Sequence, residues 1–173
     1  MTDPSPISLR PERAEDAQAI CDLVARAFAP MPFSDGTEAA LVGDLRDAGD
    51  LTLSLVAHDA QGTILGHIGY SPVRIAGADC GWFQMAPVSV APGHQRQGIG
   101  SALIRAGIEA MAGQGARGLA VVGNPAFYER FGFAVHPALA PEHEADAPWF
   151  RTLPLSGEVP AGLLRYAPAF YPG

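Results

Sequence analysis

The chain has 173 residues, of which 48% are hydrophobic and 17% charged, and it carries a formal net charge of −7. This composition excludes a disordered chain and a coiled coil, and it predicts a single compact domain over residues 1–173. The acidic balance argues against nucleic acid as a partner, because phosphate backbones are bound by basic surfaces.

The N-terminal segment and the cysteines indicate the compartment. Residues 1–12 contain prolines and charges where a signal peptide needs an apolar run, and no stretch approaches the roughly 18 apolar residues that span a membrane. Cys21 and Cys80 form no CxxC pair and are expected to be free thiols. We therefore expect a soluble, cytoplasmic protein that has no membrane partner.

The hydrophobic pattern predicts an alternation of strands and helices. In chain order these are a strand at 7–10, helices at 14–28 and 37–48, strands at 51–58, 63–75 and 79–91, a helix at 98–112, a strand at 119–122, a short helix at 124–130, a strand at 132–135, and one or two strands among the loops of residues 149–166. This order predicts an α/β (α+β) fold: a mixed, mostly antiparallel central sheet flanked by helices on both faces. Pro87 cannot donate a ladder hydrogen bond, so its strand must bulge or part from a neighbour there.

A glycine-rich turn precedes the predicted helix at 98–112. A strand, such a turn and a helix start leave backbone N–H groups unpaired, and the helix dipole adds positive charge, which suits a phosphate or pyrophosphate. A Walker loop does not fit, because Ile99 stands where its lysine is needed, and a dinucleotide fingerprint does not fit, because Leu103 replaces its third glycine. The segment from Gln95 to Gly100, QRQGIG, instead matches the pattern [Q/R]-x-x-G-x-[G/A].

With this motif the chain resembles the GNAT superfamily of N-acetyltransferases. A second segment, from Asn124 to Phe133, also resembles that superfamily, with Asn124, Tyr128 and Gly132 in register and Ala126 outside it. The resemblance covers residues 7–133, and it extends to a widespread bacterial branch whose substrates are poorly defined. The chain is therefore expected to have a GNAT-like fold.

The resemblance implies an N-acetyltransferase that moves the acetyl group of acetyl-CoA to a primary amine, by direct attack in a ternary complex. The acceptor, a small molecule or a peptide, is not identified, and a homodimer is compatible with the family. The implied cofactor-binding residues are Val88, Ser89, Val90, Gln95, Arg96, Gln97, Gly98, Ile99, Gly100, Ser101, Asn124 and Tyr128. The implied catalytic groups are the Val88 backbone N–H, which polarises the thioester carbonyl, and Tyr128, which donates a proton to the departing thiolate.

The chemistry of the residues agrees with the role of Tyr128, because a phenol with a pKa near 10 stays protonated at neutral pH. For the base that deprotonates the amine, His67, Glu38 and an ordered water chain all remain open. The histidines show no metal-binding spacing, so no metal is expected. The alternative function is a non-catalytic acyl-CoA-binding sensor, which has no need of a proton donor such as Tyr128.

Overall fold

The computed structural model describes residues 6–32 and 34–171, whose contacts divide into two compact units. Unit 1 contains residues 6–69, apart from residue 33, and residues 87–107; unit 2 contains residues 70–86 and 108–171. The strands and helices are β1 (Ser8–Pro11), α1 (Ala17–Phe28), α2 (Glu38–Asp47), β2 (Leu53–His58), β3 (Ile64–Ile75), β4 (Ala78–Val90), α3 (Ile99–Gly113), β5 (Gly118–Val122), α4 (Pro125–Tyr128), β6 (Leu139–Pro141), β7 (Phe150–Pro154) and β8 (Gly162–Arg165). Short 3₁₀ turns lie at Ala14–Asp16, Glu129–Phe131, Glu144–Trp149 and Pro168–Phe170.

The strands form an eight-stranded sheet in the order β1-β2-β3-β4-β5-β7, while β8 pairs with both β3 and β6. The pairs β1–β2, β3–β8 and β5–β7 are antiparallel, whereas β4–β5 and β6–β8 are parallel. The predicted fold class, a mixed and mostly antiparallel sheet with flanking helices, is confirmed. The prediction of a single domain stays a prediction.

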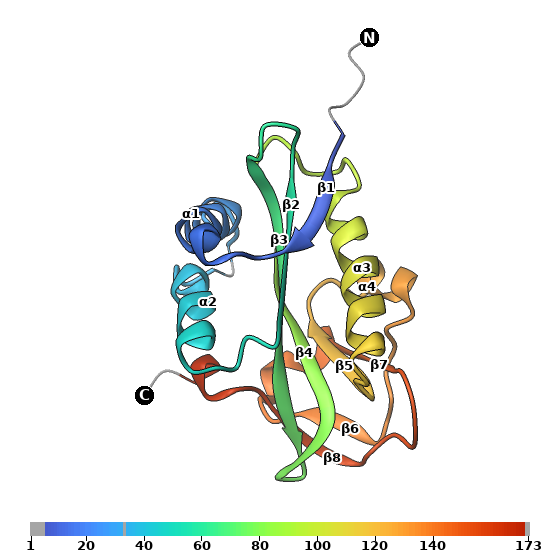
Figure 1. The fold of residues 1–173 in the computed structure, drawn as a ribbon. Coiled ribbons are helices and arrows are strands. Elements are labelled where there is room, and N and C mark those ends of the chain that lie inside the picture. Colours follow the sequence, from blue (N-terminus) through green and yellow to red (C-terminus); the bar gives the residue numbers. More distant parts are fainter. Residues whose placement is uncertain (1–5, 33, 172–173) are drawn as a thin grey trace. The chain divides into compact units, whose positions relative to one another are not determined.

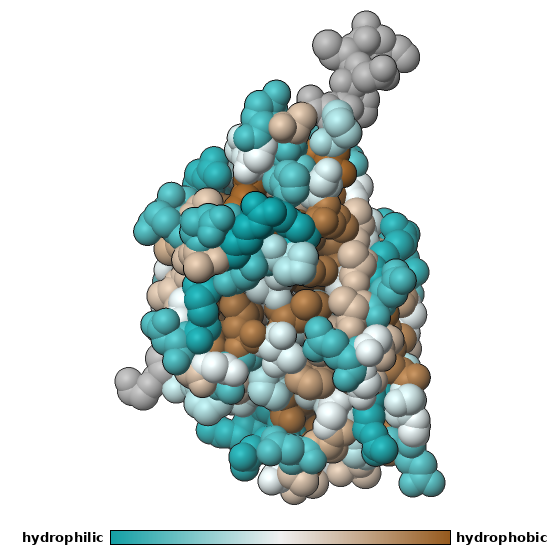
Figure 2. Space-filling model, viewed as in Figure 1, coloured by the Kyte–Doolittle hydropathy of each residue, from teal (hydrophilic) through white to brown (hydrophobic). Residues whose placement is uncertain are grey.

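In unit 1, helix α1 shows why the sequence folds this way. Its apolar residues recur at helical spacing and form one buried face, made up of Ile20, Leu23, Val24 and Ala27. The opposite face is polar and exposed, and there the Gln18 amide donates to the Asp22 carboxylate one turn later, at 2.9 Å. Figure 2 shows that the outward surface over α1 and α2 is mainly hydrophilic. Within unit 1, α1 and α2 lie on one side of β1, β2 and the start of β3, and the start of α3 lies on the other (Figure 1).

Helix α3 packs against β3 at a position where only glycine fits. A Cβ atom on Gly66 would lie 2.8 Å from Leu103 Cδ1 and 2.9 Å from Ile99 Cγ2, closer than real Cβ contacts come. Ile99 and Leu103 are both buried, so neither can swing out to solvent without loss of apolar burial. The absence of a side chain at residue 66 therefore sets the distance between the start of α3 and the sheet.

In unit 2, the ladder between β4 and β5 is short. It pairs residues 82–84 of β4 with residues 118–120 of β5, and the rest of β5 pairs only with β7. The ladder thus ends before Pro87, as expected for a strand that parts from its neighbour there. Trp82 packs so closely on Gly118 that a Cβ on this glycine would lie 2.3 Å from the indole ring.

The predicted strand at 132–135 is wrong. Only Ala134 makes a strand-like contact, an isolated bridge to Thr152 on β7. Gly132 adopts the left-handed φ of +98° that ends the preceding 3₁₀ turn, and Val135 is 64% exposed. Only one residue of this segment pairs with β7, which is too few for a strand.

Replacing Gly66 with alanine is expected to destabilise the protein by about 1–3 kcal/mol, because the new methyl group overpacks the contact between α3 and β3. Gly43→Ala is the matched control, since Gly43 lies within α2 and a Cβ there meets nothing within 4 Å. That change is expected to stabilise by about 0.5–1 kcal/mol through helix propensity. Urea unfolding of both variants measures the difference, and equal effects would contradict the close packing at Gly66.

Candidate functional site

The turn between β4 and α3 has an unusual backbone. Gly93, Arg96 and Gly98 have φ values of +89°, +62° and +86°, all in the left-handed region. Arg96 pays a conformational penalty there, of about 1–2 kcal/mol, because a Cβ clashes with the following carbonyl in that region. Alternating left-handed and right-handed residues turn successive backbone N–H groups toward one concave surface, an arrangement that binds anions.

The N–H groups of this turn are left without backbone acceptors. Across residues 6–32 and 34–171, no backbone carbonyl accepts from the N–H groups of residues 95–101, and the first one satisfied is that of Ala102, which donates to the Gly98 carbonyl at 3.0 Å. A Cβ on Gly98 would meet nothing within 4 Å, so the surface beside it is open. The turn therefore offers donors and space that fit a pyrophosphate group.

The glutamine side chains of the motif face the turn itself. The Gln95 amide donates to the Val90 carbonyl at 3.2 Å and the Gln97 amide donates to the Gly93 carbonyl at 3.4 Å. These bonds brace the loop in its left-handed conformation. The Ile99 side chain is buried against the sheet, so only its backbone faces the turn.

The last residues of β4 lie in the same unit as the turn. Val88 and Val90 are half-buried, whereas the Ser89 side chain between them is 2% exposed and its hydroxyl has no hydrogen-bond partner among the described residues. At the end of the strand, the Ala91 N–H donates to the Leu65 carbonyl of β3 at 2.8 Å. Unit 1 thus brings together the predicted residues Val88–Val90 and Gln95–Ser101.

Asn124 and Tyr128 lie in unit 2. Asn124 immediately precedes α4, and Tyr128 is the last residue of this helix. The Asn124 side-chain oxygen accepts the Ala126 N–H at 3.1 Å and so caps this helix, which leaves the amide hydrogens as its free donors. The Tyr128 ring lies on the backbone of Gly123, where a Cβ would be 2.5 Å from Cε2 of the tyrosine. The Phe127 and Phe133 rings meet it edge-on, with centroids 5.1 and 6.2 Å away.

These contacts hold the Tyr128 ring in place, and burial keeps its phenol protonated. Burial raises the pKa of Tyr128 to about 12, because the charged phenolate is poorly solvated there. A neutral, rigidly held phenol is able to donate a proton to an anionic group that forms beside it.

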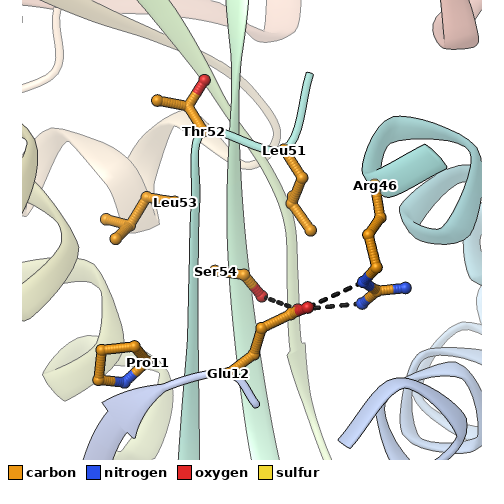
Figure 3. Close-up of a pocket in the computed structure, with 7 residues that line it drawn as sticks. All are labelled: Pro11, Glu12, Arg46, Leu51, Thr52, Leu53 and Ser54. Atoms are coloured by element: carbon orange, nitrogen blue, oxygen red, sulfur yellow. Dashed lines mark hydrogen bonds and ion pairs between the residues drawn. The ribbon is translucent and has the colours of Figure 1, made fainter. Parts of the chain in front are cut away.

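A second polar arrangement in unit 1 joins four elements of the chain. The Arg46 guanidinium, on α2, donates to the Glu12 carboxylate at 2.8 and 3.0 Å, and Glu12 immediately follows β1. The Ser54 hydroxyl, on β2, donates to the same carboxylate at 2.5 Å (Figure 3). Ser54 Oγ also lies 2.8 Å from Nε2 of His67 on β3. We call these residues, Arg46, Glu12, Ser54 and His67, the buried polar chain.

Burial controls protonation in the buried polar chain. His67 is fully buried, and this burial lowers its pKa to about 4, so the imidazole is neutral at neutral pH. Burial raises the pKa of Glu12, but the hydrogen bonds from Arg46 and Ser54 outweigh it and hold the pKa below its ordinary value. No motif in the sequence links these positions, so only His67 was identified as a candidate from the sequence.

The other candidates from the sequence lie elsewhere. Glu38, at the start of α2, accepts a hydrogen bond from the Ser34 hydroxyl at 2.9 Å and takes no part in the buried polar chain. Two large aromatic residues, Tyr70 on β3 and Trp82 on β4, are core residues that are 0% and 2% exposed. In the described part of the chain, no group of three or more His, Cys, Asp or Glu residues could hold a metal ion.

Comparison with known proteins gives the family. A family model of the acetyltransferase (GNAT) domain matches residues 51–135. The uncharacterised N-acetyltransferase YhbS of Escherichia coli K12 is 37% identical over 141 residues, which cover 82% of this chain and 79% of YhbS. The chain belongs to the GNAT acetyltransferase family. The resemblance inferred from the two motifs and the assignment as an acyltransferase are thereby confirmed.

Two solved structures share this fold over almost the whole chain. A GNAT family acetyltransferase from Brucella melitensis, in complex with acetyl-CoA, is 40% identical with a TM-score of 0.86, covering 96% of this chain and 99% of its own. Escherichia coli YhbS in complex with CoA is 34% identical with a TM-score of 0.89, covering 98% and 95%. Among the described helices, none is both long and apolar enough to cross a membrane.

Acidification is expected to destabilise the protein through His67. An unfolded histidine has a pKa of about 6.5 and folded His67 one of about 4, so the unfolded state binds more protons between these values. The contribution of neutral His67 to the free energy of unfolding is fully present above pH 6.5. It is lost as the pH decreases toward 4, and the loss amounts to up to about 3 kcal/mol. Of the charged groups facing His67, Glu12 opposes this shift and Arg46 reinforces it.

Urea unfolding at several pH values between about 7 and 5 measures this loss of stability. His67→Gln, which does not titrate, is the comparison, and its unfolding free energy should depend less on pH in this range. Parallel curves for the two proteins would show that His67 is not the titrating group.

Proposed function

We propose that this protein transfers the acetyl group of acetyl-CoA to a primary amine, by direct attack of the amine in a ternary complex. The turn at residues 95–101, with its free backbone N–H groups, is the observation that carries the proposal. The complexes of the related Brucella and Escherichia coli proteins with acetyl-CoA and CoA support the same cosubstrate here. When bound, acetyl-CoA supplies an electrophilic thioester carbon and a thiolate leaving group.

In this proposal each predicted site residue has a defined task. The backbone N–H groups of the turn, from Gln95 to Ser101, bind the pyrophosphate, and Gly98 keeps the surface open for it. The backbone of Val88–Val90 pairs with the pantetheine arm like an added strand. The Val88 N–H polarises the thioester carbonyl, as a fixed dipole aimed at developing negative charge.

Tyr128 supplies the proton for the thiolate, and Asn124 uses its free amide hydrogens to bind the pantetheine arm. Because the phenol has a pKa of about 12, it holds its proton until a basic thiolate is present. Direct attack requires no acyl carrier on the protein. Burial raises the pKa of the Cys80 thiol, which makes it a poor nucleophile.

Titration calorimetry with acetyl-CoA tests the binding site. Gly98→Trp is expected to weaken binding at least about tenfold, a free-energy cost of about 1.4 kcal/mol or more, because the side chain fills the open surface of the turn. Gly115→Trp is the matched control, since Gly115 has a similar φ of +89°, lies just after α3 and also faces open space. Equal binding by the two variants would place the cosubstrate elsewhere.

Release of the CoA thiol in the presence of primary amines tests the reaction. A panel of polyamines, amino acids and short peptides is the acceptor set, and Tyr128→Phe is expected to slow transfer about 10²–10⁴-fold while acetyl-CoA binding is unchanged. If wild-type protein binds acetyl-CoA and acetylates no amine of the panel, the result favours the acyl-CoA sensor over the enzyme.

Gly123→Ala tests whether the contact between the Tyr128 ring and the Gly123 backbone is needed for transfer. Its methyl group would occupy the position of the Tyr128 ring edge, so the ring must turn and transfer should slow by more than tenfold, with cosubstrate affinity unchanged. Gly113→Ala, at the end of α3 where a Cβ meets nothing within 4 Å, should leave the rate unaffected. If Gly123→Ala transfers acetyl groups at the wild-type rate, the contact between Gly123 and the Tyr128 ring has no part in catalysis.

A further inference from the structure

The hydrogen-bond directions in the buried polar chain determine which nitrogen of His67 carries a hydrogen. Glu12 is ionised, because its pKa is held below its ordinary value, so it accepts the hydroxyl hydrogen of Ser54. Ser54 has no other hydrogen to give. Its oxygen must therefore accept from Nε2 of His67 across the 2.8 Å contact.

The other ring nitrogen of His67, Nδ1, then carries a lone pair and no hydrogen. Nδ1 of His67 is buried and has no hydrogen-bond partner in the part of the chain that the structure describes. Leaving such an atom unsatisfied costs about 1–3 kcal/mol, which an apolar side chain at this position would avoid. The structure thus holds a neutral imidazole whose Nδ1 carries a lone pair that is able to accept a proton.

The outer end of the buried polar chain reaches solvent. Glu12, Arg46 and Ser54 line an open hollow together with Pro11 and residues 51–53 (Figure 3). The Glu12 side chain is 17% exposed, so a proton that arrives on its carboxylate is able to leave to water. A path for protons therefore runs from buried His67 through Ser54 to Glu12 and the surface.

The inner end lies beside the last residues of β4, within unit 1. The Ala91 N–H donates to the Leu65 carbonyl, and β3 and β4 are consecutive strands of a hairpin, so they are antiparallel. Leu65 lies two residues before His67, so the end of β4 lies beside this part of β3. Ser89 also has a buried, unpartnered side-chain oxygen, and it lies in the segment to which the proposed function assigns the thioester end of acetyl-CoA.

We propose that His67, Ser54 and Glu12 form a proton relay in which Nδ1 of His67 removes the proton from the attacking amine. This inference rests on the proposed function and assigns its general base. His67 is the catalytic base; Ser54, Glu12 and Arg46 act through it, as positioning residues that hold the tautomer and carry the proton outward.

The step balances without a charged imidazole. As the amine nitrogen bonds to the acetyl carbon and the carbon–sulfur bond breaks, Nδ1 takes a proton from the nitrogen and Tyr128 gives one to the sulfur. The Nε2 hydrogen passes to Ser54 and the Ser54 hydrogen passes to Glu12, which releases it to water, while Tyr128 regains a proton from water. After the product leaves, Nδ1 gives its proton to water and the relay runs in reverse, so that Nε2 regains a hydrogen from Ser54, Ser54 from Glu12, and Glu12 from water. His67 changes tautomer and stays neutral throughout, so the same burial that lowers its pKa is compatible with its role.

Steady-state kinetics with the best acceptor of the amine panel test the relay. Ser54→Ala and His67→Gln are expected to lower kcat about 10²-fold or more, with acetyl-CoA affinity within about twofold of wild type. Ser54→Thr keeps the hydroxyl and should recover most of kcat. In Ser54→Ala and His67→Gln, kcat should rise with pH across the neutral range, because the amine then depends on hydroxide, whereas wild type stays nearly flat.

Tyr166→Phe is the control for a merely structural role. It removes a hydroxyl that donates to the Asp146 carboxylate at 3.3 Å in unit 2, and it should leave kcat and its pH profile unchanged. If Ser54→Ala and His67→Gln transfer acetyl groups at the wild-type rate, the relay is overturned while the proposed function stands. If wild-type protein neither binds acetyl-CoA nor acetylates an amine, the proposed function fails, and the relay fails with it.

Nitrogen-15 NMR of histidine-labelled protein tests the inference without an acceptor. Wild-type His67 should show the tautomer with hydrogen on Nε2 near neutral pH, and Ser54→Ala should lose this preference. A hydrogen on Nδ1 of His67 in the wild-type protein overturns the relay, whatever the kinetics show.

Discussion

Helix α3 approaches β3 closely only because residue 66 has no side chain, and the glycine-rich turn between β4 and α3 depends on this approach. The bond from Ala91 to the Leu65 carbonyl fixes the start of the turn, and the contact of Ile99 and Leu103 with Gly66 fixes its end. Both anchors are thus adjacent residues of one strand. With its two ends held this near to each other, the chain between them is confined to a tight loop with left-handed residues, and its N–H groups turn outward.

The next residue of β3, His67, faces the opposite side of the strand because side chains alternate there. On that side it meets Ser54 instead of α3, and through Ser54 the carboxylate of Glu12. Leu65, Gly66 and His67 therefore tie the turn, the helix and the buried polar chain to one short segment of strand. A shift of β3 by one residue would exchange the two faces and disrupt all three at once.

Burial has opposite chemical consequences for the two groups to which proton transfer is assigned. Loss of solvent disfavours the charged form of each, which for Tyr128 is the deprotonated form and for His67 the protonated form. The phenol therefore keeps its proton and the imidazole keeps its lone pair. In the proposed mechanism, one physical effect thus prepares both the donor for the thiolate and the acceptor for the amine, and burial is the largest cause of each pKa shift.

The sequence predicts those features whose determinants are local. The motif from Gln95 to Gly100 and the helix after it are contiguous, so pattern and spacing identify them, and the prolines and glycines bound most of the helices and strands within a few residues. The strand predicted at 132–135 failed because its apolar residues pack at a 3₁₀ turn and a single bridge, which local pattern does not distinguish from a ladder. The buried polar chain joins residues 12, 46, 54 and 67, whose proximity arises only when four elements pack together.

The net charge of the protein affects its two proposed ligands, acetyl-CoA and the amine, in opposite ways. A chain of net charge −7 repels an anion at long range. In the proposed function this repulsion is offset locally by the backbone N–H groups of the turn, whose dipoles are fixed and independent of pH. The same net charge favours the approach of a cationic amine. Such an amine is not nucleophilic until it has lost one proton to water, and its nitrogen loses a second proton as it bonds to the acetyl carbon. In the proposed relay it is this second proton that needs a route to solvent. Glu12 is suited to the outer end of this proposed route, because Arg46 and Ser54 keep it a weak base that does not retain the proton.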